Sequence, residues 1–173
     1  MLKKYIAIAK KVKESKKIEQ QVFNLLSRFE NNDSIVVKKF NTITSTCVKG
    51  QEKILAQLGI HYDVFDYESS YMDKTKDILS QLEKSKKIFK DEEGRIILDL
   101  KATSIENQMK SPVMVLTRSD GTGLYPLRDI AYTINKLKIA KKNLLVLGED
   151  QKLYFQQVKQ ALAFLGFESP EVI

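Results

Sequence analysis

Hydrophobic residues recur at helical spacing through the first third of the chain. Between residues 3 and 29 they fall on one side of a helix, and Ser15 is placed to break that helix into two segments. A polar turn at residues 30–34 follows, and residues 35–58 continue the helical pattern. Gly59 stands where a helix C-cap glycine belongs. The first sixty residues are therefore predicted to be mainly helical.

The pattern changes after Gly59, where short apolar runs replace long amphipathic stretches. We expect, in order, a short strand at residues 60–65, a helix at 71–86, a β-hairpin at 88–98 around an acidic turn, and a polar linker at 101–111. This middle region completes a mainly helical segment that contains one small β-hairpin.

The last third alternates apolar strands with helices. The predicted elements are a buried strand at residues 113–117, a helix at 126–138, a second buried strand at 144–147 and a helix at 152–165. This order with short loops is typical of a parallel α/β sheet. Two parallel strands leave their edges uncovered, and no third strand is predicted before Ile173. The chain is therefore expected to be part of a larger fold.

Chemistry is expected at the carboxyl ends of these strands, where open parallel sheets bind ligands. The loops at these ends are residues 118–124 and 148–151. Tyr125 and Asp129 lie four residues apart, so a helix would bring a phenol and a carboxylate to one face, which suits a planar cation. Taken singly, each has a structural explanation: Asp129 would favour the N-terminal end of a helix dipole, and Tyr125 would fit a core.

Composition excludes several classes of protein. The 173 residues are 43% hydrophobic, as in globular proteins, and no apolar run approaches the ~18–20 residues of a membrane helix. The single cysteine, Cys47, excludes an internal disulfide and a cysteine-built metal site. The single histidine, His61, argues against a histidine zinc site and a Ser-His-Asp hydrolase. We expect a cytoplasmic protein without a membrane partner or a metal site.

The positive charge is concentrated at one end of the chain. Residues 1–53 hold 12 basic and 5 acidic side chains, which accounts for the whole net charge of +7. A basic segment beside a neutral remainder is typical of a protein that contacts a polyanion such as RNA. A solvated helical face would carry the same residues, so both explanations stay open.

Two stretches resemble the arginyl-tRNA synthetases, which are class I aminoacyl-tRNA synthetases: residues 119–132, SDGTGLYPLRDIAY, and residues 146–155, VLGEDQKLYF. The segment from Leu58 to Ser69 resembles the part of the family that precedes them. The resemblance is strongest over residues 113–166 and weakens toward the N-terminus. It implies an enzyme that activates L-arginine with ATP, accompanied by Mg²⁺, and transfers it to tRNA(Arg).

The resemblance also implies the roles of individual residues. The arginine pocket would consist of Tyr125, Asp129 and Gln151, with Glu68 as a second carboxylate. Asp129 can accept two parallel hydrogen bonds from a guanidinium, which an ammonium cannot reproduce. The ATP-binding positions would be Gly148 and Asp150. No catalytic residue and no metal ligand is assigned.

The chain departs from the family pattern in three places. It contains neither the HIGH motif nor the KMSKS loop, which hold the ATP phosphates, and Tyr154 stands where many relatives carry histidine. The implied fold is half of a Rossmann-like parallel nucleotide-binding domain at residues 111–173, preceded by a helical lead-in and connecting insertion at residues 1–110. Such a fragment is expected to be inactive without segments that carry HIGH and KMSKS. The alternatives are a basic tRNA-binding or RNA-binding module and a non-catalytic assembly partner.

Overall fold

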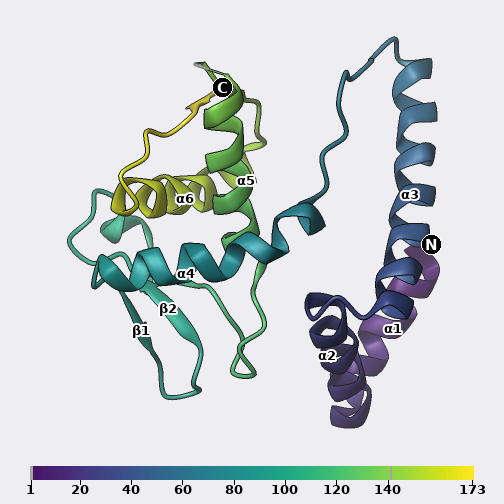
Figure 1. The fold of residues 1–173 in the computed structure, drawn as a ribbon, viewed down its shortest axis with the longest axis horizontal. Helices are drawn as coiled ribbons and strands as arrows, with labels where there is room; N and C mark the ends of the chain where they lie inside the picture. Colours follow the sequence, from purple (N-terminus) through teal and green to yellow (C-terminus); the bar gives the residue numbers. More distant parts are fainter. Residues whose placement is uncertain (1, 141) are drawn as a thin grey trace. The chain divides into compact units, whose positions relative to one another are not determined.

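A computed structural model describes residues 2–140 and 142–173 of the chain. The chain divides into two compact units, residues 1–65 and residues 66–173 (Figure 1).

The first unit consists of three helices, α1 (Leu2–Glu14), α2 (Lys16–Glu30) and α3 (Ser34–Gln57). Ser15 has an extended backbone between α1 and α2, so the predicted break is confirmed. Asp33 caps α3, because its carboxylate accepts hydrogen bonds from the backbone N–H groups of Ile35 and Val36, both at 3.1 Å. Gly59 follows α3 with a φ of 71°, a conformation that favours glycine, so the predicted helix end is confirmed as well.

Residues 60–65 form no strand in the described structure, so this prediction was wrong. Val64 is 76% exposed and most of its neighbours are exposed too. An apolar run becomes a strand only when a neighbouring strand satisfies its backbone hydrogen bonds and one of its faces is buried.

The second unit is a mixed α/β structure. Its elements are η1 (Glu68–Lys74), α4 (Thr75–Lys84), β1 (Ile88–Lys90), β2 (Ile96–Asp99), η2 (Glu106–Gln108), β3 (Val113–Val115), α5 (Tyr125–Ile139), β4 (Leu144–Leu145), η3 (Glu149–Gln151), α6 (Lys152–Phe164) and β5 (Glu171–Val172). The helices near 71–86, 126–138 and 152–165 are thus confirmed, the first of them beginning as a 3-10 turn.

An antiparallel sheet in the order β1-β2-β3 lies beneath the helices. The predicted hairpin is confirmed: Ile88 pairs with Leu98, and Asp91 closes the turn by accepting the backbone N–H of Arg95 at 2.8 Å. The strand at 113–117 joins this hairpin, since Met114 pairs with Leu98 in antiparallel register. Its expected parallel pairing with residues 144–147 was therefore wrong.

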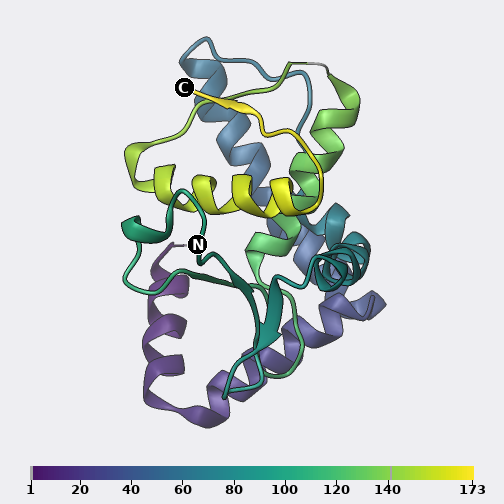
Figure 2. The ribbon, with the colours of Figure 1, turned by 90° about the vertical axis from the view of Figure 1, so that its left-hand side faces the viewer.

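A second, parallel pair of strands is formed by β4 and β5, with Leu145 opposite Val172. After α6 the chain turns back to reach β4 (Figures 1 and 2). The expectation that no strand follows residue 165 was wrong for this reason. The α/β class is confirmed, whereas the parallel half of a Rossmann-like domain is not clearly visible in two strands of two residues each.

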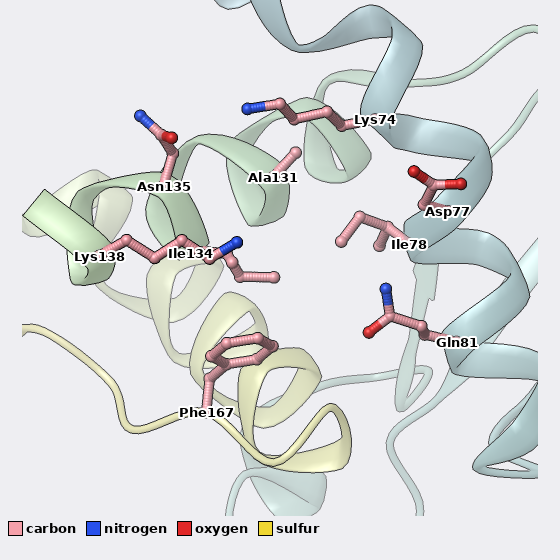
Figure 3. A pocket seen from close by; sticks show the side chains of 9 residues that line it. All are labelled: Lys74, Asp77, Ile78, Gln81, Ala131, Ile134, Asn135, Lys138 and Phe167. Carbon is pink, nitrogen blue, oxygen red and sulfur yellow. The ribbon is translucent and has the colours of Figure 1, made fainter.

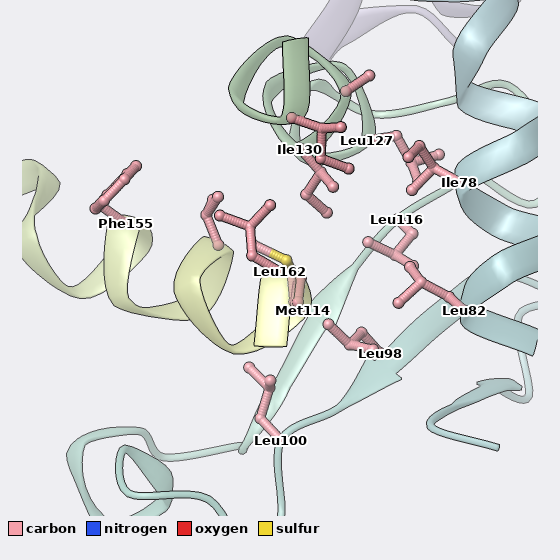
Figure 4. Packing of buried hydrophobic residues seen from close by; sticks show 14 of the residues in the cluster. Ile78, Leu82, Leu98, Leu100, Met114, Leu116, Leu127, Ile130, Phe155 and Leu162 are labelled. Atoms are coloured by element: carbon pink, nitrogen blue, oxygen red, sulfur yellow. The ribbon is translucent and has the colours of Figure 1, made fainter. Parts of the chain in front are cut away.

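One hydrophobic core holds the second unit together. Figure 4 shows side chains converging from α4, the antiparallel sheet, α5 and α6, and six of the leucines in this core are fully buried: Leu82, Leu98, Leu100, Leu116, Leu127 and Leu162. Burying each contributes about 1.5–3 kcal/mol before entropy is counted. The core contains residues from both sides of the expected boundary between residues 110 and 111. The correspondence of 1–110 and 111–173 to two parts of a catalytic region stays a prediction.

Within the described residues, no helix is both long and apolar enough to cross a lipid bilayer.

Candidate functional site

A closed loop positions the start of α5. Asp120 Oδ1 accepts hydrogen bonds from the backbone N–H of Thr122 at 2.9 Å and from its hydroxyl at 2.7 Å, while Gly121 has a φ of 83°. The N–H of Leu124 then donates to the carbonyl of Leu116 at 2.8 Å, which ties the loop to the end of β3. The loop fixes the direction in which α5 leaves the sheet, and so fixes the face on which its polar residues lie.

A cavity of about 180 Å³ lies between α5, the region of β4 and the start of α6. Its polar lining includes Asp129, Thr133 and Lys136 on α5, Gln151, and Tyr154 on α6. Leu145 and Leu147 are among its apolar residues. It is smaller than the ~300–1,000 Å³ of pockets for drug-sized ligands. Its dimensions suit one end of a small molecule, such as a single side chain.

Asp129 and Tyr154 meet inside this cavity. The Tyr154 hydroxyl donates a hydrogen bond to Asp129 Oδ2 at 2.5 Å, and the Tyr154 ring lies 5.1 Å from the ring of Tyr125. Tyr154 was not among the predicted binding residues, because an aromatic residue on a helix is usually a packing residue. The only signal in the sequence was its replacement of the histidine found in many relatives.

The cavity places Asp129 in a partly desolvated environment. Burial raises the pKa of its carboxyl, the Tyr154 hydrogen bond lowers it, and the negative charge of Glu68 raises it. Burial likewise lowers the pKa of Lys136, whose ammonium lies 4.2 Å from the centroid of the Tyr132 ring. The site thus combines a carboxylate whose ionisation is opposed by burial with the ammonium of a half-buried lysine.

Glu68 lies outside the set of residues that line the cavity, and it forms an ion pair with Arg128. Arg128 also donates to the carbonyl of Gly123 at 3.0 Å. A hydrogen-bond chain secures the η1 segment that carries Glu68: the Tyr71 hydroxyl donates to Asp66 at 2.5 Å and accepts from Asn135 at 3.0 Å. Glu68 therefore influences the pKa of Asp129 through its negative charge, while its carboxylate pairs with the guanidinium of Arg128.

Three of the remaining predicted residues, Gly148, Asp150 and Gln151, follow β4 in the chain. Gly148 precedes η3, and a Cβ added there would lie 2.7 Å from Asp150 Oδ1. The amide of Gln151 donates to Asp150 Oδ2 at 3.2 Å. Gln151 lines the cavity, whereas Gly148 and Asp150 are not among the described residues that line it. Tyr125 is 53% exposed and reaches the site through its contact with Tyr154.

A larger cavity of about 260 Å³ lies between α4 and α5. Figure 3 shows Ile78 and Gln81 of α4 facing Ile134 of α5, with Phe167 at one end. None of the predicted binding residues lines it among the described residues. Over residues 2–140 and 142–173, no group of three or more His, Cys, Asp or Glu side chains could hold a metal ion.

Comparison with known proteins identifies the family. Residues 1–173 match the family model described as tRNA synthetases class I (R), catalytic domain. The chain belongs to the arginyl-tRNA synthetase family. The resemblance read from residues 119–132 and 146–155 is thereby confirmed.

Archaeal members of the arginyl-tRNA synthetase family resemble the chain over almost its full length. It is 36% identical to an arginine–tRNA ligase of Methanocaldococcus jannaschii, over 98% of this chain and 30% of that protein. It is 35% identical to the arginine–tRNA ligase of Methanothrix thermoacetophila, with the same coverage. The chain therefore spans about 30% of the length of these relatives.

A solved structure shares the fold. The crystal structure of arginyl-tRNA synthetase from Plasmodium falciparum superposes with a TM-score of 0.70 over 91% of this chain and 27% of that chain. Its sequence identity is 16%, so this likeness concerns the fold alone.

Proposed function

We propose that this chain supplies the arginine-binding part of an arginine–tRNA ligase. In that reaction the carboxylate of L-arginine attacks the α-phosphate of ATP and releases pyrophosphate. A ribose hydroxyl of tRNA(Arg) then attacks the carbonyl of the resulting mixed anhydride, arginyl-adenylate, which forms the ester to the ribose and releases AMP. The observation that carries the proposal is the Asp129 carboxylate in a cavity of side-chain size.

Asp129 would bind the guanidinium of arginine. An ionised carboxylate accepts two parallel N–H bonds from this planar fork, and partial desolvation strengthens them. Tyr125 would cover the ligand with its exposed ring, and Gln151 would orient polar atoms of the amino acid. Glu68 would act mainly through its charge, because its carboxylate already pairs with Arg128.

ATP would bind next to this pocket, at Gly148 and Asp150. The unit formed by β4, α6 and β5 pairs two parallel strands across a helix, which is compatible with a piece of a Rossmann-like nucleotide-binding domain. No residue of this chain is assigned to the ATP phosphates, and the Mg²⁺ expected with ATP stays a prediction, as does the cytoplasmic location.

Titration with L-arginine tests the pocket. The 173-residue chain is expected to bind L-arginine, and Asp129→Asn is expected to weaken binding by at least about tenfold, because a neutral amide cannot form charge-assisted bonds. Glu168→Gln removes an exposed carboxylate of the same unit and serves as the control. Binding that survives unchanged in Asp129→Asn, or its absence from the unmodified chain, would contradict the proposal.

A measurement of pyrophosphate exchange tests whether the chain needs segments with the HIGH and KMSKS motifs to activate arginine. The chain alone is expected to give no arginine-dependent exchange of pyrophosphate into ATP, because it carries neither a HIGH motif nor a KMSKS loop. Exchange should appear when segments that carry both motifs are supplied. Exchange by the chain alone would contradict this expectation.

RNA binding is a second candidate function, favoured by the basic residues of 1–53. The lysines of α1, including Lys10, Lys11 and Lys13, lie on a helix without buried residues in its described part. Binding of tRNA through phosphates should weaken steeply with salt, and replacing these three lysines by glutamine should reduce the salt slope. A non-catalytic assembly partner, the third alternative, would not bind tRNA. It would also not restore pyrophosphate exchange when segments with the HIGH and KMSKS motifs are supplied.

A further inference from the structure

The hydrogen bond between Tyr154 and Asp129 joins two helices at the proposed arginine pocket. Tyr154 lies in the first turn of α6, and Asp129 lies in the second turn of α5. The Tyr154 hydroxyl donates to Asp129 Oδ2, and this hydrogen bond is charge-assisted when the carboxylate is ionised. Both side chains line the same cavity, so the bond lies at the wall of the proposed pocket.

The bond has a geometric consequence for the carboxylate. An ionised carboxylate offers about four lone-pair positions, and the Tyr154 hydroxyl occupies one of them on Oδ2. The remaining positions are then held in one orientation, because rotation of the carboxyl group would break the bond. A planar guanidinium needs two acceptors in a fixed plane, so it gains from a carboxylate that does not rotate.

We propose that Tyr154 is a positioning residue for arginine, which holds the Asp129 carboxylate so that its remaining acceptor positions receive the guanidinium. This inference rests on the proposed function of the cavity. Tyr154 is itself held by its ring contact with Tyr125, at 5.1 Å between centroids. Tyr125 thus supports the pocket through Tyr154 as well as through its exposed face.

The protonation of Asp129 provides a readout that a purely structural role would not change. Charged or titratable groups face Asp129 from three elements: Tyr154 from α6, Glu68 from η1, and Arg128, Tyr132 and Lys136 from α5. The hydroxyl of Tyr154 stabilises the ionised carboxylate and lowers its pKa, against the larger effect of burial, which raises it. Removing the hydroxyl should therefore raise the pKa of Asp129, and arginine binding should be lost at a higher pH as the solution is acidified.

Tyr154→Phe is the decisive variant, because phenylalanine keeps the ring and its packing on Tyr125. In ligand-free protein, a ¹³C NMR titration of the Asp129 carboxyl carbon is expected to move to higher pH. In a titration with L-arginine at pH 7, the affinity is expected to fall by about tenfold, because the released carboxyl group can rotate and must be ordered again when the guanidinium binds.

Tyr71→Phe is the matched control. It removes a hydroxyl that donates to another aspartate, Asp66, at the same 2.5 Å distance in the same unit. Because Tyr71 also accepts a hydrogen bond from Asn135, its loss of stability should be at least as large as that of Tyr154→Phe. Tyr71 reaches Asp129 only indirectly, through the segment that carries Glu68, so the Asp129 titration should move clearly less than in Tyr154→Phe. Urea unfolding of Tyr154→Phe and Tyr71→Phe measures the change in the free energy of unfolding.

The outcomes separate the inference from the proposed function. Equal Asp129 titrations and equal arginine affinities in the unmodified chain and Tyr154→Phe would overturn the inference alone. An equal shift of the Asp129 titration in Tyr71→Phe would also overturn it, since the effect would then be general. No arginine binding by the unmodified chain would overturn the proposed function and the inference with it.

Discussion

Glu68 and Arg128 form an ion pair that joins η1 to the first turn of α5, across 60 positions of sequence. Glu68 was expected to meet the guanidinium of a substrate, and in the structure it meets the guanidinium of the chain itself. The same contact brings a negative charge close enough to raise the pKa of Asp129. Glu68 therefore has a structural partner and an electrostatic effect on the pocket at the same time.

Replacing Glu68 by glutamine should mainly break this ion pair. We expect Glu68→Gln to lower the free energy of unfolding by about 0.5–1 kcal/mol, since the carboxylate is half exposed and solvent screens the pair. Arginine affinity should fall less than in Asp129→Asn. Urea unfolding of Glu68→Gln, Arg128→Gln and the double variant measures the coupling between the two side chains. Additive stability losses, together with a loss of arginine affinity as large as in Asp129→Asn, would show that Glu68 binds the ligand directly.

The local elements could be predicted from the sequence, whereas the pairing of the strands could not. The break at Ser15, the helix end at Gly59 and the hairpin at residues 88–98 depend on capping, positive φ and turn residues, which act over a few positions. The direction of β3 is defined by its partner β2, with which it pairs in antiparallel register through backbone hydrogen bonds. A short apolar run such as residues 113–117 carries no information on the direction of its partner.

The candidate site could be predicted only in part, because contacts between distant elements are not visible in the sequence. Asp129 and Gln151 were identified by motif order, and they line one cavity. The partners that determine the state of Asp129 come from other elements: Tyr154 lies 25 positions away in α6, and Glu68 lies in η1. Helical spacing can place residues on one face of a helix, and it says nothing of which other helix packs against that face.

Lys136 should oppose the binding of a cation in the pocket. It lines the same cavity as Asp129, and an ammonium repels a guanidinium in a partly desolvated site. We expect Lys136→Met to bind L-arginine about three- to tenfold more tightly at low ionic strength, with a smaller gain at high salt. Lys138→Met is the control, because Lys138 lies on the same helix and lines the other cavity. Weaker arginine binding in Lys136→Met would mean that the ammonium contacts an anionic part of the ligand.

The core of the second unit should be sensitive to a cavity at Leu116. This side chain is fully buried beneath α4 and α5 (Figure 4). We expect Leu116→Ala to lower the free energy of unfolding by about 2–5 kcal/mol, measured by urea denaturation. Ile139→Ala, at a position that is 75% exposed, should change it by no more than about 0.5 kcal/mol. Similar losses in both variants would contradict the described core.

Gly148→Ala should disturb the proposed ATP site without unfolding the chain. The backbone at Gly148 has a φ of −69°, which alanine adopts, but the new Cβ would lie 2.7 Å from Asp150 Oδ1 and displace that carboxylate. We expect the affinity for ATP to fall by about tenfold, while L-arginine binding is retained. Gly50→Ala in α3 is the control, since a Cβ there meets no atom within 4 Å. ATP binding that is equal in the unmodified chain and Gly148→Ala would remove Gly148 from the site.

The guanidinium specificity of the pocket can be measured directly with two ligands of nearly equal shape. L-citrulline carries a neutral ureido group where L-arginine carries its cationic fork, so only arginine can form charge-assisted bonds to Asp129. Calorimetric titration of the 173-residue chain is expected to give at least about tenfold tighter binding of L-arginine, and Asp129→Asn should abolish this preference. Equal affinities for the two ligands in the unmodified chain would contradict the account.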